Sequence, residues 1–233
     1  MTGDRLEARL AAIAALAEPA RRLLYRYVAA QTQPVSRDQA AAGVGVPHHV
    51  AKFHLDRLVD DGLLSADYSR PPGRGGPGAG RPAKLYQRAD VDLEVSVPDR
   101  RYDLAGRLLA SAVARAAREE RPAVETLRDV AIEAGRDRGA AARERLDRRP
   151  RRAEVCAAVL DALADEGYEP CLEGGDVTLV NCPFDALARV ETELVCGMNL
   201  AYCEGLIEGV GKVPMEAVLD PAPGRCCVRL NER

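Results

Sequence analysis

Apolar residues recur every three or four positions along most of the chain, and this spacing predicts a mainly helical protein. The first 30 residues carry two such helical patterns, with a break at Pro19. The apolar positions are Leu6, Leu10, Ile13 and Leu16 in the first helix, and Leu23, Leu24, Tyr27 and Val28, expected to face inward, in the second.

Two more helices with a glycine turn between them are predicted next. Ser36 and Gln39 have the spacing of a capping box, and the short helix they begin should end at the Gly43–Gly45 turn. Pro47 suits the start of the following helix, and Gly62 its end. This order is typical of a helix-turn-helix, whose second helix lies in the DNA major groove. The buried face of that helix should carry Ala51, Leu55, Leu58 and Val59.

Residues 63–69 and 84–88 alternate like strands on either side of a segment rich in Gly and Pro. The basic residues of that segment fit a wing that follows DNA phosphates or enters the minor groove. We expect His54 to form local hydrogen bonds. The residues expected to contact DNA are His48, His49, Lys52, Phe53, Arg57, Arg70, Arg74, Arg81 and Lys84.

The rest of the chain continues the helical pattern and adds short strands. Helices are expected over residues 102–119, 122–147 and 151–167, a hairpin over 168–181, a helix from Cys196 to Gly209, and a final strand pair turning at 221–224. The predicted fold is mainly α with small β elements: an N-terminal winged helix-turn-helix (1–90), central linker or dimerisation helices (91–150) and a C-terminal α+β cysteine-rich sensor module (151–233).

Charge is distributed unevenly. The net charge is −3, but residues 1–88 carry +5 and residues 151–233 carry −8. Phosphate binding needs only local positive charge, so the N-terminal segment remains suited to DNA. No long apolar run or signal peptide is present, which predicts a cytoplasmic protein without membrane contact. We find no nucleotide loop or Ser-His-Asp set and no histidine outside residues 48–54, so we expect no enzyme activity.

Six of the seven cysteines lie beyond residue 170, and none forms a Cys-x2-Cys pair typical of structural zinc. Any ligands must come from separate elements: Cys182 in a loop entering a helix, Cys196 at a helix start and Cys226 in a strand. Cys227 should face the other side of that strand. Such an arrangement suits an iron–sulfur cluster. Cys156 and Cys171 are expected to be small buried hydrophobic residues, and Cys203 mainly structural.

Several motifs resemble known regulators. The N-terminal motifs resemble winged-helix regulators of the ArsR type. The wing end and the C-terminal motifs are similar to the iron–sulfur repressors of the SUF cluster-assembly operon, and this similarity runs along most of the chain. The matching motifs are Glu18-Pro19-Ala20-Arg21-Arg22-Leu23-Leu24, His54-Leu55-x-x-Leu58-x-x-x-Gly62-Leu63, Gly80-Arg81-Pro82-x-Lys84-x-Tyr86, Asn181-Cys182-Pro183-Phe184, Glu193-Leu194-Val195-Cys196, and Cys226 or Cys227.

This resemblance implies a [4Fe–4S] cluster held by Cys182, Cys196 and Cys226, or by Cys227 in place of Cys226. Relatives in that family have four evenly spaced cysteines, whereas here the interval from Cys196 to Cys226 is long. The fourth ligand therefore stays open among Cys203, a non-cysteine donor and solvent, and a [2Fe–2S] cluster stays an alternative.

The resemblance further implies a homodimeric repressor that binds double-stranded operator DNA. It would control iron–sulfur assembly genes in response to cluster status, oxidants or nitric oxide. Whether the protein represses or activates stays open. The alternatives are a zinc- or thiol-based redox regulator, and a regulator with a small organic ligand in its C-terminal module.

Overall fold

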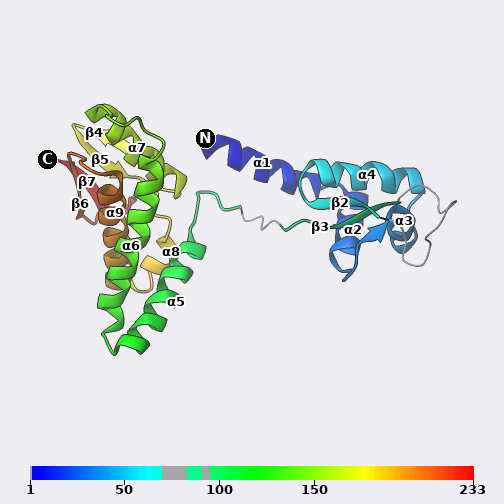
Figure 1. The fold of residues 1–233 in the computed structure, drawn as a ribbon, viewed down its shortest axis with the longest axis horizontal. Coiled ribbons are helices and arrows are strands. Elements are labelled where there is room, and N and C mark those ends of the chain that lie inside the picture. Colours follow the sequence, from blue (N-terminus) through cyan, green and yellow to red (C-terminus); the bar gives the residue numbers. More distant parts are fainter. Residues whose placement is uncertain (1, 70–82, 91–94) are drawn as a thin grey trace. The chain divides into compact units, whose positions relative to one another are not determined.

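The computed structural model describes residues 2–69, 83–90 and 95–233. The chain forms two compact units, Met1–Val95 and Ser96–Arg233. Over the described residues it is mainly helical, with nine helices and two small antiparallel sheets, one in each unit (Figure 1). The expectation of a mainly α protein with small β elements is therefore confirmed at this level.

The N-terminal unit combines four helices with a three-stranded sheet. Strand β1 lies between the second and third helices in the chain, β2 and β3 follow the fourth helix, and the sheet has the antiparallel order β1-β3-β2. Its elements are α1 (Thr2–Ala15), α2 (Pro19–Ala29), β1 (Val35–Ser36), α3 (Arg37–Val44), α4 (His48–Asp60), β2 (Leu64–Ser69) and β3 (Ala83–Arg88).

The predicted start of α3 is confirmed, whereas its predicted end is partly wrong. Ser36 Oγ accepts a hydrogen bond from the Gln39 amide at 3.3 Å, and Gln39 Oε1 accepts one from the Ser36 amide at 2.8 Å. The helix runs through Gly43, and only Gly45 takes the left-handed turn conformation, with φ of 73°. Gly43 serves packing instead, because a Cβ there would lie 2.1 Å from the Tyr27 ring.

The apolar positions of α1 and the expected inward positions of α2 are only partly buried in the structure. Leu10 and Ile13 are 40% and 43% exposed, and Leu23 is 51% exposed. The first helix packs through Ala12 and Ala15, because its small residues allow a close approach to the core, so the larger apolar side chains lie on its outer side. Leu24 and Val28 are buried as expected. The side chain of Leu6 lies outside the described part of the chain.

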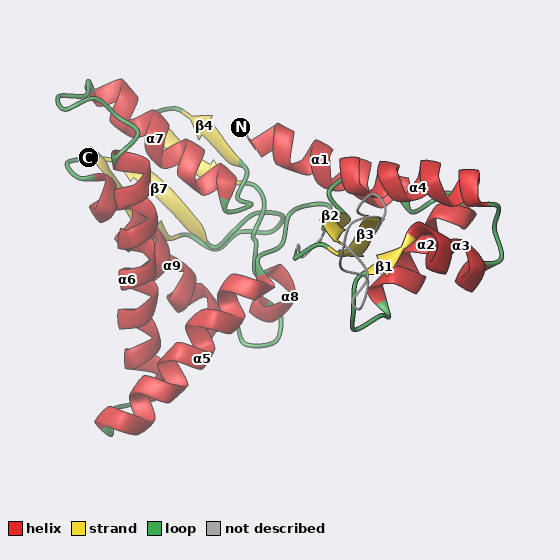
Figure 2. Cartoon of the chain, turned by 45° about the vertical axis from the view of Figure 1, so that its right-hand side comes forward, coloured by secondary structure: helices red, strands yellow, loops and turns green. Residues whose placement is uncertain are grey.

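The C-terminal unit packs helices against a four-stranded antiparallel sheet of order β4-β5-β7-β6. Figure 2 shows this sheet beside α7 and α9. The elements are α5 (Tyr102–Glu119), α6 (Ala123–Arg143), α7 (Arg152–Asp165), β4 (Pro170–Glu173), β5 (Asp176–Leu179), α8 (Asp185–Ala188), α9 (Thr192–Val210), β6 (Met215–Leu219) and β7 (Val228–Glu232).

One hydrophobic core extends through the whole C-terminal unit. Leu108 of α5 and Leu127 of α6 belong to the same buried cluster as Leu163 of α7, Leu206 of α9 and Leu230 of β7. The helices expected as a separate region over residues 91–150 therefore share their core with the cysteine-containing segment.

Helices α6 and α9 lie side by side in backbone contact (Figures 1 and 2). A Cβ on Gly135 would lie 2.2 Å from the Tyr202 carbonyl oxygen, and one on Gly139 would lie 2.1 Å from that of Leu206. Reciprocally, a Cβ on Gly205 would lie 2.1 Å from the Ile132 carbonyl oxygen. Glycines spaced four apart on both helices allow this approach, and α9 carries the candidate ligand Cys196.

In the part of the chain that the structure describes, no helix combines the length and the apolar character needed to cross a membrane.

Candidate thiol site and nucleic-acid interface

Four cysteines from three separate segments meet in the C-terminal unit. Cys182 lies in the loop between β5 and α8, Cys196 in α9, and Cys226 and Cys227 directly before β7. The pKa of Cys182 is affected by Cys226, that of Cys226 by Cys182 and Cys227, and that of Cys196 by Cys227, which indicates that the four thiols lie near one another. The amide of Cys226 donates to the Leu179 carbonyl at 2.8 Å, which ties this segment to the end of β5.

A buried polar network supports these sulfurs. Asn199 of α9, only 1% exposed, donates from Nδ2 to Cys226 Sγ at 3.1 Å, and Cys227 Sγ lies 3.9 Å from the same nitrogen. The Tyr168 hydroxyl donates to Asn199 Oδ1 at 2.5 Å. Cys203 Sγ lies 3.9 Å from both of these oxygens. The amide of Asn199 is therefore held with its N–H groups toward the thiols.

Cys196 and Cys226 are buried and Cys182 and Cys227 are partly buried, and the pKa values of Cys182, Cys196 and Cys226 are raised. The pKa of Cys182 is raised by its hydrogen bond to Cys226 and by burial. Burial raises the pKa of Cys196 as well. For Cys226 the hydrogen bond from Cys182 lowers the pKa, but the bond to Cys227 and burial outweigh it and bring the pKa to about 11. The free thiols of Cys182, Cys196 and Cys226 are therefore protonated at neutral pH.

The loop of Cys182 is fixed from outside the thiol site. Asn181, buried to 7% exposure, donates from Nδ2 to the carbonyl oxygens of Asp99 at 2.9 Å and Gly167 at 2.6 Å. Arg100 donates to Asn181 Oδ1 and, at 3.3 Å, to the Cys182 carbonyl. These bonds hold the loop in position without any contact made by the Cys182 thiol.

Two local expectations for this site are wrong. Cys196 lies in the second turn of α9 and not at its start, because the helix begins at Thr192. Cys226 lies just before β7, which begins at Val228, and not in a strand as expected. The buried amide of Asn199 contacts the thiol site from α9, through its bond to Cys226 Sγ.

The remaining cysteines differ from one another. Cys203 is fully buried beside Tyr168 and Asn199 and belongs to the supporting network. Cys156 is half-buried against the core. Cys171 is exposed on β4, so the expectation that it is a buried hydrophobic residue is wrong; its position on an edge strand of the sheet explains the exposure.

The donor set limits which metal groups could bind here. Among the described residues, no three His, Cys, Asp or Glu side chains are arranged to hold a metal ion. The four thiols thus form no ready site for one zinc ion. An iron–sulfur cluster differs, because its thiolate ligands bind different iron atoms around the cluster. An all-thiol set with an amide N–H directed at one sulfur matches that chemistry.

The candidate DNA-contact residues described by the structure gather on α4 and β3. His49, Lys52 and Phe53 are exposed on α4, and Phe53 is 65% exposed. His48 and Arg57 are exposed as well, but His48 Nε2 lies 2.9 Å from Asp38 and Arg57 forms an ion pair with Asp61 at 3.0 Å. Arg70, Arg74 and Arg81 lie outside the described residues.

Lys84 is engaged within its own unit. Its Nζ lies 2.6 Å from Asp56 Oδ1, which also accepts a hydrogen bond from the Tyr86 hydroxyl at 2.8 Å. Lys84 therefore joins β3 to α4 and is less available for DNA than Lys52. His54 forms the local contact expected for it, accepting from Arg21 Nε at 3.4 Å.

Sequence reasoning missed the residues that support the thiols. Asn199 is three positions after Cys196 in α9, a spacing that places both on one side of the helix, and Asn181 directly precedes Cys182. Buried polar residues beside candidate ligands were the available signal. Tyr168 and Arg100 gave none, because only the tertiary fold brings them to the site.

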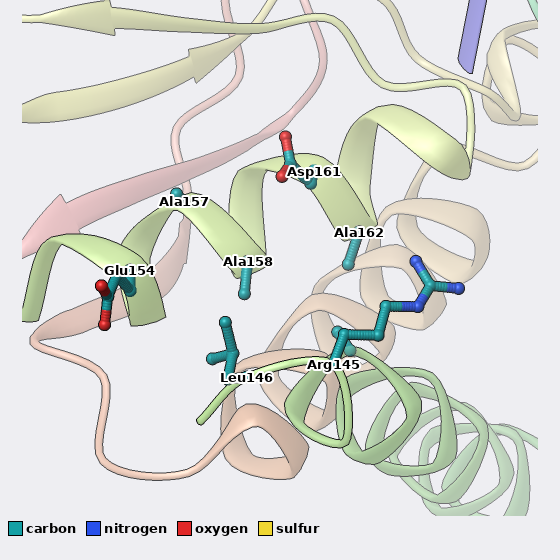
Figure 3. Close-up of a pocket in the computed structure, with 8 residues that line it drawn as sticks. Arg145, Leu146, Glu154, Ala157, Ala158, Asp161 and Ala162 are labelled. Atoms are coloured by element: carbon teal, nitrogen blue, oxygen red, sulfur yellow. The ribbon is translucent and has the colours of Figure 1, made fainter. Parts of the chain in front are cut away.

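Among the described residues, two grooves could be considered for an organic ligand: one of about 310 Å³ between the end of α6 and α7, and one of about 390 Å³ between α6 and α9. Figure 3 shows Ala158 and Ala162 directed toward the segment that carries Arg145 and Leu146, whereas the Asp161 carboxylate points away. Four alanines and Leu146 line this first groove together with the charged residues Arg145, Glu154 and Asp161.

Compared with protein-family models, with curated proteins and with solved structures, the chain has no match in any of the three.

Proposed function

We propose that this protein is a DNA-binding transcriptional regulator whose C-terminal unit holds an iron–sulfur cluster as its sensor. In this proposal α3, α4 and the β2–β3 pair form a winged helix-turn-helix, and α4 is the recognition helix. The chain acts as a homodimer on double-stranded operator DNA, without catalysis, and in the cytoplasm. Its resemblance to the SUF repressors makes iron–sulfur assembly genes the expected targets.

The convergence of Cys182, Cys196, Cys226 and Cys227 is the observation that carries the proposal. These residues are up to 45 positions apart in the sequence, yet their thiols form one connected group. A buried amide, that of Asn199, is directed at the sulfur of Cys226 and lies 3.9 Å from that of Cys227, a polar contact that hydrophobic packing of cysteines does not require. The proposed ligands are Cys182, Cys196 and Cys226. The proximity of Cys227 makes it a better candidate for the fourth position than Cys203.

The chain's own residues would prepare this site. Asn199 donates its amide N–H to the sulfur of Cys226, and the core around α9 excludes water from it. Arg100 and Asn181 hold the Cys182 loop. A bound iron–sulfur cluster supplies a group that oxidants and nitric oxide attack. Because the thiols must lose their protons to become ligands, loading releases protons.

The DNA-binding half of the proposal is supported by the exposed face of α4. His49 and Lys52 have no ion-pair partner among the described residues, and Phe53 exposes its ring beside them. The apolar side chains of Leu55 and Leu58 are buried on the opposite face of α4. A helix with this division presents polar groups to an external partner while its other side is fixed.

The cluster is tested by anaerobic purification followed by visible absorption and by iron and sulfide analysis. We expect a brown protein with both elements present. Cys182→Ser and Cys226→Ser should lose most of the iron and sulfide, while the matched control Cys171→Ser, at an exposed cysteine outside the site, should retain them. A colourless wild-type protein without sulfide would overturn the cluster.

The sensing claim needs a DNA probe. A duplex selected by the wild-type protein from a random-sequence library can be titrated with cluster-loaded and cluster-stripped protein at one salt concentration. A tenfold difference in affinity corresponds to about 1.4 kcal/mol in binding free energy. Equal affinities of the two forms would remove the sensing role.

The second candidate is a thiol-based redox regulator, favoured by the close approach of Cys182 and Cys226. Hydrogen peroxide would oxidise the two thiols to a disulfide and be reduced to two waters. The raised pKa of both thiols argues against fast oxidation, because the thiolate is the reactive form. Mass spectrometry of peroxide-treated protein, searched for a 182–226 disulfide, separates this candidate from the cluster.

A further inference from the structure

Two short segments, residues 99–101 and residues 181–183, are joined to each other by a series of hydrogen bonds. Asn181 donates to the Asp99 carbonyl at 2.9 Å, Arg100 donates to Asn181 Oδ1 and to the Cys182 carbonyl, and the Arg101 amide donates to the Pro183 carbonyl at 3.0 Å. Each residue of one segment thus bonds to the other segment, and the candidate ligand Cys182 lies in the middle.

The same pair of segments is anchored to the end of α7. Asn181 also donates to the Gly167 carbonyl at 2.6 Å, and Arg101 forms an ion pair with Glu166. Glu166, 8% exposed, pairs in turn with Arg138 of α6 at 2.8 Å. Residues 99–101 therefore lie between the Cys182 loop and the rigid helical core.

Residues 99–101 lie near the start of the C-terminal unit, close in the chain to the N-terminal unit. The C-terminal unit begins at Ser96, whose hydroxyl bonds only locally to the Pro98 carbonyl, so residues 99–101 are the first part of that unit for which the structure gives hydrogen bonds to distant segments. They lead directly into α5, which begins at Tyr102. A change in the Cys182 loop would therefore alter the hydrogen bonds that hold the chain close to where the C-terminal unit begins.

We infer that Arg100 and Asn181 are positioning residues that couple the state of the Cys182 loop to the connection between the two units. This inference rests on the proposed function. A cluster bound through Cys182 Sγ would restrain residues 181–183, and their carbonyls and amide would keep residues 99–101 in place. Loss of the cluster would remove that restraint, and the segment 96–102 would gain freedom.

A purely structural role for the same contacts predicts something different. In that case Arg100→Ala would be less stable, but the cluster would still change the DNA affinity by the same factor as in the wild type. Coupling requires that both ends bias one shared element, here the bonded pair of segments. The distinguishing readout is therefore the ratio of DNA affinities of the cluster-loaded and cluster-stripped protein, and not the melting temperature.

The first measurement uses the wild-type full chain. Hydrogen–deuterium exchange is followed by mass spectrometry for peptides covering residues 96–102 and 181–188, before and after the cluster is removed with an iron chelator and ferricyanide. We expect faster exchange in both peptides after removal. Faster exchange over 181–188 with no change over 96–102 would overturn the coupling.

The second measurement uses Arg100→Ala with Arg107→Ala as its matched control. Arg107 is an arginine of the next helix, paired only with Asp103 by the contacts described. With the selected duplex, the wild-type protein and Arg107→Ala should show a loaded-to-stripped affinity ratio of about 5- to 150-fold, the usual range of allosteric coupling. Arg100→Ala should load iron and sulfide but show a ratio near one.

The outcomes separate this inference from the proposed function. If the wild-type protein contains no cluster or shows no affinity ratio, the proposed function has failed. If the wild type shows the ratio and Arg100→Ala keeps it undiminished, only the coupling has failed. Should Arg100→Ala not load the cluster, the exchange experiment on the wild type decides.

Discussion

At the scale of single residues, Asn199 is a buried amide whose oxygen and nitrogen both have hydrogen-bond partners in the C-terminal unit. Its side chain is almost fully buried, with the Tyr168 hydroxyl on its oxygen and the Cys226 sulfur on its nitrogen. A buried amide that keeps its partners contributes modestly to stability, whereas a partner left alone loses its hydrogen bond without regaining water.

We predict that Asn199→Ala lowers the free energy of unfolding by about 1–3 kcal/mol, because Tyr168 is then left unsatisfied. Urea denaturation monitored by circular dichroism measures this. Tyr168→Phe should also destabilise the protein, because it leaves the buried Asn199 Oδ1 without its hydroxyl donor. In the cluster-loaded protein, Asn199→Ala should also lower the reduction potential, because the N–H to sulfur bond stabilises the more negative reduced state. An unchanged potential would contradict the role of the amide toward Cys226.

Asp56 gives a second residue-level prediction, on pH. Burial alone would raise its pKa, but the hydrogen bonds from Lys84 and Tyr86 outweigh burial and bring the pKa below its ordinary value of 3.8. A carboxyl whose pKa is depressed by folding stabilises the protein above its unfolded pKa and loses that contribution as the pH falls through the folded value. The N-terminal unit should therefore lose stability below about pH 4.

The variant Asp56→Asn isolates this contribution. Thermal unfolding of the wild type and the variant should differ most near neutral pH, and the difference should shrink as the pH falls below 3.8. The control is Asp67→Asn, at an exposed carboxyl of β2 for which the structure gives no ion pair among the described residues. A constant difference between wild type and Asp56→Asn across this pH range would exclude the bridge to Lys84 as its source.

At the scale of elements, the contact between α6 and α9 determines where Cys196 and Asn199 can lie. Glycines on both helices let the backbones touch, and this removes the space that any side chain would need. Glycine is otherwise unfavourable in a helix by about 1 kcal/mol relative to alanine. Its repeated presence here therefore indicates that close approach outweighs helix propensity.

Gly139→Ala and Gly205→Ala should accordingly destabilise the protein by about 1–3 kcal/mol, because each new Cβ would meet backbone atoms of the neighbouring helix. Gly106→Ala is the matched control. It lies in α5, where a Cβ would meet nothing within 4 Å, and it should stabilise the protein by about 0.5–1 kcal/mol. Urea denaturation of the three variants tests the opposite signs. A stabilised Gly139→Ala would show that the two helices are further apart.

At the scale of the whole molecule, the two units have separate chemical characters that the proposed function joins. The basic excess lies in the N-terminal segment and the acidic excess in the cysteine-containing segment. DNA binding should therefore depend on individual cations of the first unit, and the dependence on salt reports how many phosphates they meet.

We predict that Lys52→Gln weakens binding to the selected duplex and reduces the slope of log affinity against log salt by about 0.9, the value of one phosphate contact. Lys84→Gln should change the slope less, because Lys84 is held by Asp56 at 2.6 Å. Fluorescence anisotropy at several salt concentrations measures both slopes. A larger effect of Lys84→Gln would reverse the ranking that the structure gives to these two residues.

The homodimer stays a prediction at this scale, measurable by light scattering coupled to size-exclusion chromatography. Leu10, Ile13 and Leu23 are candidates for a dimer interface, because these apolar side chains are exposed in the single chain. We expect a mass of about two chains, in keeping with the two-fold symmetry of most DNA sites read by helix-turn-helix proteins. A monomer at all concentrations would contradict it.

Local physics determined much of this protein. Apolar spacing, the Ser36 capping box and the glycine turns specify α3, α4 and their neighbours, because each depends on residues only a few positions apart. The types and order of the helices and strands in the C-terminal unit follow from the sequence in the same way. What the sequence misjudged is which side of a helix is buried, as at Leu10 and Leu23, because that depends on the size of the residues on the facing element.

Only the tertiary structure decided how the cysteines meet. Cys182, Cys196, Cys226 and Cys227 are separated by up to 45 positions, and their proximity depends on the pairing of β5 with β7 and on the close contact of α6 with α9. The partners of the site, Tyr168, Asn199 and Arg100, are set by contacts between residues at least 27 positions apart. Periodicity carries no information over such distances, because it describes which face of an element is apolar and not which element covers that face.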